Sequence, residues 1–175
     1  MVVNNVNLVA MQESVEEMKK NPTQAKKVKQ VGGQWVFQEG EPQFRAEVEF
    51  PKGKEVLQAD FPPFLGGGGL KPDPIQYCLY GLAACFAGIF AAVAAMEGVD
   101  LKKLSVVAES KLDFSRVFGL TDNPPVEGIE LTVTVSSDAA PEKIQEIERL
   151  ARERCPGVYC FTNPIPLKTK LIQKG

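Results

Sequence analysis

The sequence predicts an α+β fold in which two main helices pack on curved antiparallel sheets. Three patterns indicate this fold. The twenty residues from Tyr77 to Met96 carry no charge, which predicts one long buried helix. Apolar and polar residues alternate over 129–136, which predicts a strand. Apolar residues recur at every third or fourth position over 141–154, which predicts a second helix.

Composition places the chain among ordinary globular proteins. It has 175 residues, of which 44% are hydrophobic and 24% are charged. A net charge of −2 gives no basis for binding nucleic acid or an anionic membrane. No basic segment followed by an apolar run opens the sequence, so we expect no secretory leader. Four cysteines without a leader favour a reducing compartment, and we expect the cytoplasm.

The sequence contains no histidine, and this absence excludes several kinds of site. Ser–His–Asp and Cys–His catalytic arrangements are excluded, as are histidine bases and histidine metal ligands. Any nucleophile must therefore be activated by a charge or by a carboxylate.

The first 29 residues predict a helix and a linker that precede a domain over 30–175. A short amphipathic helix is expected over 1–20, and Asn21-Pro22 ends it. The apolar face of this helix holds Leu8, Met11, Val15 and Met18.

Two strands follow, over 34–37 and 43–50, and they predict a hairpin. In the second strand, Arg45 lies on the side of the glutamates, so we expect it to be solvated or ion-paired. Residues 51–73 are rich in proline and glycine and predict a loop. Its run Gly66–Gly69 matches neither a Walker A loop nor a dinucleotide-binding fingerprint, so no cofactor is expected.

The long apolar helix has clear ends. Asp73 is a good N-cap, Pro74 suits the first helical position, and Gly98 suits a left-handed C-cap. A helix that is apolar on every side either spans a membrane or is covered by protein. We expect burial and no membrane contact, because seven alanines and two glycines favour insertion weakly and no Lys or Arg cluster flanks the helix closely. One small sheet cannot cover this helix, which favours a homodimer.

The remaining elements complete the predicted order of helix, two strands, long helix, two strands, helix and strand. A strand is expected over 104–114, and the alternating strand over 129–136 follows a proline-containing loop. The second helix, over 141–154, should end at Pro156-Gly157. A last strand is expected over 165–172.

The four cysteines are the candidates for chemistry. Cys78 and Cys85 lie on one helix about 10 Å apart along its axis, too far to share one zinc ion, so no metal is expected. Cys85 lies in the middle of the long helix, and Cys155 continues the apolar face of the second helix. If these helices pack, the two thiols can form a redox pair; the alternative is that both are inert buried hydrophobes. Cys78 and Cys160 are interpreted as structural.

The segment GGGGLKPDPIQYCLYGLAACFAGIFAA resembles the central helix of the OsmC/Ohr family, the osmotically inducible and organic-hydroperoxide-resistance proteins. A glycine-rich loop precedes Pro74, and the helix then carries A-A-C-F around Cys85. The likeness continues with Arg154-Cys155-Pro156 after the second helix and with Asn163-Pro164. It covers about residues 30–173 and leaves the N-terminal helix outside.

The resemblance implies an OsmC-like intertwined homodimer with sites at its interface. It implies that Cys85 attacks an organic hydroperoxide and that Cys155 resolves the resulting sulfenic acid as a disulfide. A dithiol reductant of the lipoyl type then restores the enzyme. The apolar residues beside which the peroxide would enter are Tyr77, Phe86 and Phe90.

The sequence departs from the peroxidase pattern at one position. Family peroxidases carry a glutamate directly after the proline that starts the helix, where this chain has Ile75. That glutamate holds an arginine beside the reactive thiolate, and Arg45 is the only candidate in the early strands. Two alternatives therefore stand beside a peroxidase. One is a non-catalytic dimer that binds an apolar ligand or senses oxidants, and the other is a structural protein with inert thiols.

Overall fold

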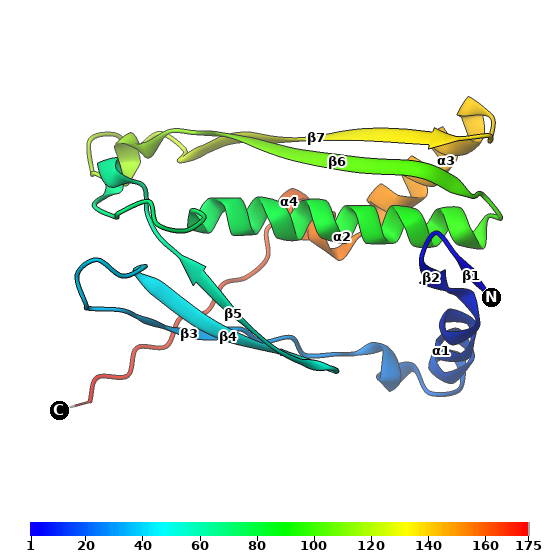
Figure 1. Ribbon diagram of the computed structural model, residues 1–175, viewed down its shortest axis with the longest axis horizontal. Coiled ribbons are helices and arrows are strands. Elements are labelled where there is room, and N and C mark those ends of the chain that lie inside the picture. Colours follow the sequence, from blue (N-terminus) through cyan, green and yellow to red (C-terminus); the bar gives the residue numbers. More distant parts are fainter. Residues whose placement is uncertain (175) are drawn as a thin grey trace.

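The computed structural model describes residues 1–174, and within them it has an α+β fold with antiparallel sheets and four α-helices (Figure 1). Its strands are β1 (Val2–Val3), β2 (Val6–Asn7), β3 (Gly32–Trp35), β4 (Phe44–Phe50), β5 (Gly53–Ala59), β6 (Leu101–Leu112) and β7 (Val126–Ser137). Its helices are α1 (Leu8–Lys20), α2 (Pro74–Met96), α3 (Pro141–Arg154) and α4 (Pro156–Thr162). Short 3₁₀ helices lie at Pro22–Ala25, Pro63–Leu65 and Phe114–Arg116.

Helix α2 begins and ends as the sequence predicts. The Asp73 side chain accepts a hydrogen bond from the backbone N–H of Ile75 at 2.7 Å. The Gln76 side chain accepts one from the backbone N–H of Asp73 at 2.8 Å, which completes a capping box. Beyond the helix, Gly98 has a φ of 71°, a left-handed conformation that suits glycine.

The hydrophobic core lies between α2, the β6–β7 ribbon and α3. Figure 1 shows the ribbon running along one side of α2, with α3 and α4 packed nearby. The ribbon is antiparallel and pairs Val106 with Val133. The fully buried side chains at the centre of this core include Phe86, Phe90, Val93, Ile147 and Ala151.

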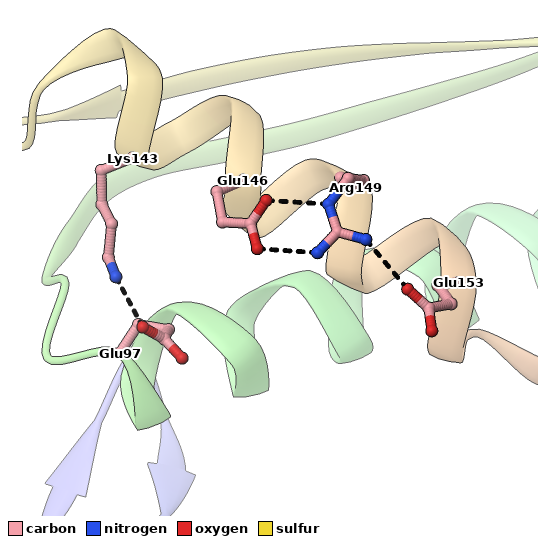
Figure 2. Close-up of polar contacts among 5 residues, drawn as sticks. All are labelled: Glu97, Lys143, Glu146, Arg149 and Glu153. Carbon is pink, nitrogen blue, oxygen red and sulfur yellow. Dashed lines mark hydrogen bonds and ion pairs between the residues drawn. The ribbon is translucent and has the colours of Figure 1, made fainter.

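Helix α3 follows its predicted bounds, and its charged side faces away from the core. Lys143 Nζ lies 2.5 Å from Glu97 Oε2, which links the start of α3 to the end of α2 (Figure 2). Arg149 forms a two-pronged pair with Glu146 at 2.8 Å and also reaches Glu153 at 3.1 Å (Figure 2). These pairs are exposed and screened by solvent, so each contributes little to stability.

The predicted N-terminal helix is confirmed over 8–20, but a small β1–β2 hairpin precedes it. Asn4 and Asn5 form its turn with φ values of 53° and 59°. The Asn4 side chain donates to the carbonyl of Val99 at 2.9 Å and accepts from the N–H of Leu101 at 2.8 Å. The hairpin therefore holds the chain between α2 and β6.

The expected loop over 51–73 is wrong for its first part. Gly53–Ala59 forms strand β5, which pairs with β4 in the three-stranded sheet β3–β4–β5. A tight turn joins the two strands, and Phe50 lies opposite Gly53. The proline and glycine residues that suggested a loop lie mainly after β5, where residues 60–73 do connect the sheet to α2.

The chain after α3 also differs from the prediction. Helix α3 ends at Arg154, as expected, but Pro156 then starts the short helix α4, because proline suits the first helical position. The strand expected over 165–172 is wrong, since the described segment 163–174 has no regular structure. Its apolar side chains are exposed, with Leu167 at 89% and Leu171 at 94%. No described strand pairs with this segment.

One side of α2 lacks the protein cover that its composition predicts. Tyr80 is 73% exposed, and the small residues Gly81, Ala84 and Gly88 are exposed along the same helix. By length and composition α2 is able to cross a membrane. Its other side is buried in the core through Phe86 and other residues, as in the central helix of a globular protein.

Candidate functional site

The structure brings Cys85 and Cys155 together. Cys85 comes from the middle of α2, and Cys155 lies at the junction of α3 and α4. Their sulfur atoms are 3.5 Å apart, and both thiols are free. A disulfide requires a separation of about 2.05 Å, so a shift of about 1.5 Å is enough to join them.

The two thiols differ in their exposure. Cys155 is 1% exposed and belongs to the central hydrophobic cluster with Phe86 and Ile147. Cys85 is half-buried. A reagent from solvent therefore reaches the sulfur of Cys85 before that of Cys155.

Gly157 sets how closely α4 approaches α2. A Cβ atom at this position would lie 3.1 Å from Cys85 Cβ, 3.3 Å from Cys85 Sγ and 3.5 Å from Cys155 Sγ. These distances leave little space for a side chain beside the sulfurs. Sequence reasoning placed Gly157 only at a helix end; the run Cys155-Pro156-Gly157 was the signal that marked a tight turn at the thiol.

Burial is the main influence on the pKa of Cys155 and raises it above its usual value. The backbone N–H groups of Val158 and Gly157 lower this pKa, and the neighbouring Cys85 raises it. No Lys or Arg of the described chain is among these influences. Cys155 therefore keeps its proton at neutral pH more firmly than a free thiol.

The arginines considered from sequence form no hydrogen bond with either sulfur within residues 1–174. Arg45 is exposed on β4, and no hydrogen bond or ion pair within residues 1–174 links it to either cysteine. Arg152 pairs with Glu148 at 3.1 Å and is exposed. Arg154 is exposed at the end of α3. Ile75 lies in the first turn of α2.

A cavity of about 750 Å³ lies among α2, β7, α3 and α4, and neither Cys85 nor Cys155 is among its lining residues. Its apolar wall includes Leu82 and Phe86 of α2, which flank Cys85 in sequence, and Val158 of α4. Charged residues also line this cavity: Glu127, Glu130, Glu148, Arg152 and Glu153. The structure therefore places Phe86 between the core and this cavity.

The other two predicted substrate-binding residues lie elsewhere. Phe90 is fully buried in the core, with its ring centroid 6.2 Å from that of Phe86. Tyr77 lines a second cavity, of about 570 Å³, near the start of α2. Its hydroxyl donates to the backbone carbonyl of Gln58 on β5 at 2.8 Å. The three aromatic residues therefore do not share one pocket in the single chain.

The remaining cysteines are separate from the thiol pair. Cys78 on α2 and Cys160 on α4 are both exposed free thiols. Within residues 1–174, no group of three or more Cys, Asp or Glu side chains is placed to hold a metal ion.

The match to known proteins covers the elements that hold the two thiols. The model of the family described as OsmC-like protein matches residues 66–170, from the glycine-rich loop to the segment after α4. No curated protein matches the chain.

Several solved structures share the fold at low identity. An OsmC-like protein from Mycoplasma pneumoniae is 18% identical, with a TM-score of 0.54 over 77% of this chain and 89% of that one. An organic hydroperoxide resistance protein OsmC from Legionella pneumophila is 23% identical, with a TM-score of 0.50 over 78% and 92%. A hydroperoxide resistance protein of Vibrio cholerae, with captopril in one active site, is 19% identical, with a TM-score of 0.52 over 78% and 87%.

Proposed function

Because the chain belongs to the OsmC-like protein family, we propose that it is a thiol-dependent peroxidase that reduces organic hydroperoxides. The observation that carries this proposal is the 3.5 Å separation of the sulfurs of Cys85 and Cys155. Two thiols from distant parts of the chain meet there, and one of them is accessible from solvent. The relatives described as hydroperoxide resistance proteins point to the same class of substrate.

The first step uses Cys85 as the nucleophile. Its thiolate attacks the distal oxygen of the hydroperoxide, so that a sulfur–oxygen bond forms and the oxygen–oxygen bond breaks. The leaving alkoxide takes up a proton and departs as the alcohol, which leaves Cys85 as a sulfenic acid. The half-buried position of Cys85 supports this role, because the peroxide must reach its sulfur.

Cys155 then resolves the sulfenic acid. Its thiolate attacks Cys85 Sγ, the disulfide forms, and the hydroxyl group leaves as water after it takes up a proton. An external dithiol, for which we propose a lipoyl-type reductant, then exchanges with the disulfide and returns both cysteines to thiols. No bound cofactor takes part in this cycle.

A homodimer is part of this proposal. One chain leaves a face of α2 and the apolar segment 163–174 exposed, and a second copy would cover such surfaces. Arg45 is the proposed cation for the Cys85 thiolate. It has no contact with Cys85 inside one chain, so this role depends on the dimer bringing an arginine to the thiol. We propose the cytoplasm as the compartment, since the four cysteines are free.

The proposal is tested by peroxide consumption. With cumene hydroperoxide and dihydrolipoamide, the wild-type chain should turn over. Cys85→Ser should abolish turnover, and Cys155→Ser should stop after one equivalent with a trapped sulfenic acid. Cys78→Ser is the matched control and should keep full activity, because Cys78 is exposed and outside the pair. Absence of turnover by the wild-type chain with any peroxide would overturn the proposal.

A second function, an oxidant sensor or a carrier of an apolar ligand, is favoured by two observations. Ile75 replaces the glutamate that supports the thiolate in the family peroxidases, and no cation influences the pKa of Cys155. A sensor would form the Cys85–Cys155 disulfide reversibly but would not sustain turnover. Mass spectrometry of the oxidised chain, run beside the turnover assay, separates the two functions.

A further inference from the structure

The C-terminal arm, residues 163–174, pairs with no described strand of its own chain. Its large apolar side chains are exposed, among them Leu167 and Leu171. It also carries three exposed lysines and no acidic residue: Lys168, Lys170 and Lys174. An apolar surface with negative charge would match both properties of this arm.

The cavity of about 750 Å³ has these two properties, and we call it the acidic groove. Two buried side chains of α2, Leu82 and Phe86, form part of its apolar wall. Its lining includes four glutamates and one arginine, and this Arg152 already pairs with Glu148 at 3.1 Å. The three other glutamates are on exposed positions: Glu127, Glu130 and Glu153.

Glutamates meet on the β6–β7 ribbon without an ion-pair partner. Glu109 of β6 lies directly opposite Glu130 of β7, and Glu127 lines the same small hollow. Lys111 also lines this hollow, but no ion pair within residues 1–174 includes any of the three glutamates. Like charges directly opposite each other on neighbouring strands are destabilising, and a cation from another chain would remove this cost.

The edge of β7 at the acidic groove is open. β7 pairs only with β6 within residues 1–174, and the groove is lined by residues 126–131 of β7 and by no residue of β6. An extended segment can bind such an edge through its backbone and place alternate side chains on opposite sides. In an extended arm, Leu167 and Leu171 lie on one side, and Lys168 and Lys170 lie on the other.

The arm of the same chain is poorly placed for this groove. Asn163 still lines the groove, but the arm then runs away from the β6–β7 ribbon (Figure 1). Pro164 and Pro166 follow at once, and their fixed φ angles restrict a sharp return of the chain. The arm of a second copy does not have this constraint.

We propose that the C-terminal arm of a second copy lies along the open edge of β7 in the acidic groove, with its leucines toward the apolar wall and its lysines beside Glu127 and Glu130. Each chain gives one arm and receives one, so a symmetric dimer has two such contacts. This inference rests on the homodimer of the proposed function and names the surfaces that meet. The arm covers the acidic side of the groove and leaves the wall at Phe86 for substrate.

Charge reversal tests this contact in the full chain. The arm variant is Lys168→Glu with Lys170→Glu, and the groove variant is Glu127→Lys with Glu130→Lys. Each variant alone has like charges at both contacts of its dimer. Each should therefore weaken dimerisation at least about tenfold in analytical ultracentrifugation at low salt.

A matched control reverses two lysines of the same spacing elsewhere in the chain. Lys27→Glu with Lys29→Glu changes exposed residues outside the acidic groove and should dimerise like the wild type. Circular dichroism of every variant checks that the fold is kept.

A mixture of the two variants distinguishes a second copy from the same chain. In a heterodimer of the arm variant and the groove variant, both contacts again join opposite charges. An equimolar mixture should therefore regain the dimer affinity of the wild type. A contact between an arm and the groove of its own chain would not be regained by mixing.

Trypsin gives a second measurement, because the groove variant keeps both lysines of the arm. Cleavage after Lys168 and Lys170 should be at least about tenfold faster in the groove variant than in the wild-type dimer at equal concentration. Mass spectrometry identifies the cleaved bonds.

Three results would overturn the proposal. One is that the arm variant or the groove variant dimerises like the wild type. Another is that the equimolar mixture dimerises as weakly as the separate variants. The third is that trypsin cleaves the arm equally fast in the groove variant and in the wild type. A dimeric wild type with any of these results keeps the homodimer and removes only the arm contact, whereas a monomeric wild type removes both. Peroxide turnover is measured separately and does not bear on these outcomes.

Discussion

Gly157 controls the approach of the two sulfurs, since a Cβ atom there would lie 3.1 Å from Cys85 Cβ. In Gly157→Ala the methyl group must push α4 or the Cys85 side chain away by a few tenths of an ångström. We expect disulfide formation after one equivalent of peroxide to slow about tenfold, because small displacements of reacting groups are costly. The free energy of unfolding should fall by about 1 kcal/mol.

Gly32→Ala is the matched control for this change. A Cβ atom at Gly32 has no neighbour within 4 Å, and the residue does not have a positive φ. The control should form the disulfide at the wild-type rate. If Gly157→Ala also keeps the wild-type rate, the distance between the sulfurs does not limit their reaction.

The burial of Cys155 predicts a pH dependence for the resolving step. Burial raises the pKa of this thiol, so the attacking thiolate is scarce at pH 7 and becomes common as the pH rises. The rate at which the Cys85 sulfenic acid becomes a disulfide should rise about tenfold per pH unit from pH 7 to 8.5. Competition with dimedone, followed by mass spectrometry, measures this rate. A flat profile would mean that Cys155 is already ionised at neutral pH.

Phe90 is expected to act in the core, because it is 0% exposed. Phe90→Ala should lower the free energy of unfolding by about 3–5 kcal/mol. Phe86→Leu changes a wall of the cavity of about 750 Å³ and should raise KM for cumene hydroperoxide, whereas Phe90→Leu should leave KM unchanged. Urea unfolding and steady-state kinetics measure these effects. An equal rise in KM for the two Leu variants would indicate that Phe90 belongs to the substrate-binding site.

Sequence reasoning found the cysteines but missed their neighbours, and the difference is physical. Helical spacing places Cys85 and Cys155 on faces that can meet, and the residue pattern of the family identifies both. The role of Gly157 depends on contact with residue 85, which is far away in sequence. The environment of Asp60 was not predictable for the same reason, because it forms only when the loop over 60–73 folds around this side chain. Local patterns do not contain such contacts.

At the level of elements, the β1–β2 hairpin is expected to fix the end of α2. Asn4→Gly keeps the positive φ but removes the side-chain hydrogen bonds to Val99 and Leu101. It should lower the free energy of unfolding by about 1–3 kcal/mol, because the groups are partly buried. Asn5→Gly is the matched control: Asn5 has a similar φ and an exposed side chain, so a change below about 0.5 kcal/mol is expected. Equal effects in urea unfolding would show that the side chain of Asn4 does not hold α2.

Elements with strong local signals were predictable, and those that depend on partners were not. Helix α2 has a capping box around an uncharged run, and α3 has Pro141 at its first position and clear periodicity, so their bounds follow from sequence. Strand β5 was hidden by the prolines and glycines that follow it. The segment 165–172 has an apolar composition suited to a strand, but a strand also needs a partner strand, and this segment pairs with none of the described strands.

The whole molecule exposes more surface than a compact chain of its size. Its accessible area is 13337 Å² for 19.1 kDa. A compact monomer of this mass exposes about 8,400 Å². The excess is comparable to the area that large obligate homodimers bury, about 2,000–5,000 Å² or more. Together with the exposed face of α2, this excess surface supports the proposed homodimer.

We expect the wild-type chain to sediment as a dimer at micromolar concentration, with α2 at the interface. Gly88→Glu introduces a charge on the exposed face of α2, where a Cβ atom has open space, so it should shift the chain to a monomer. Thr134→Glu places the same charge on the exposed side of β7 and should remain a dimer. A monomeric wild type in analytical ultracentrifugation, or a dimeric Gly88→Glu, would contradict this assignment; the first result would leave the excess surface to be covered by another partner.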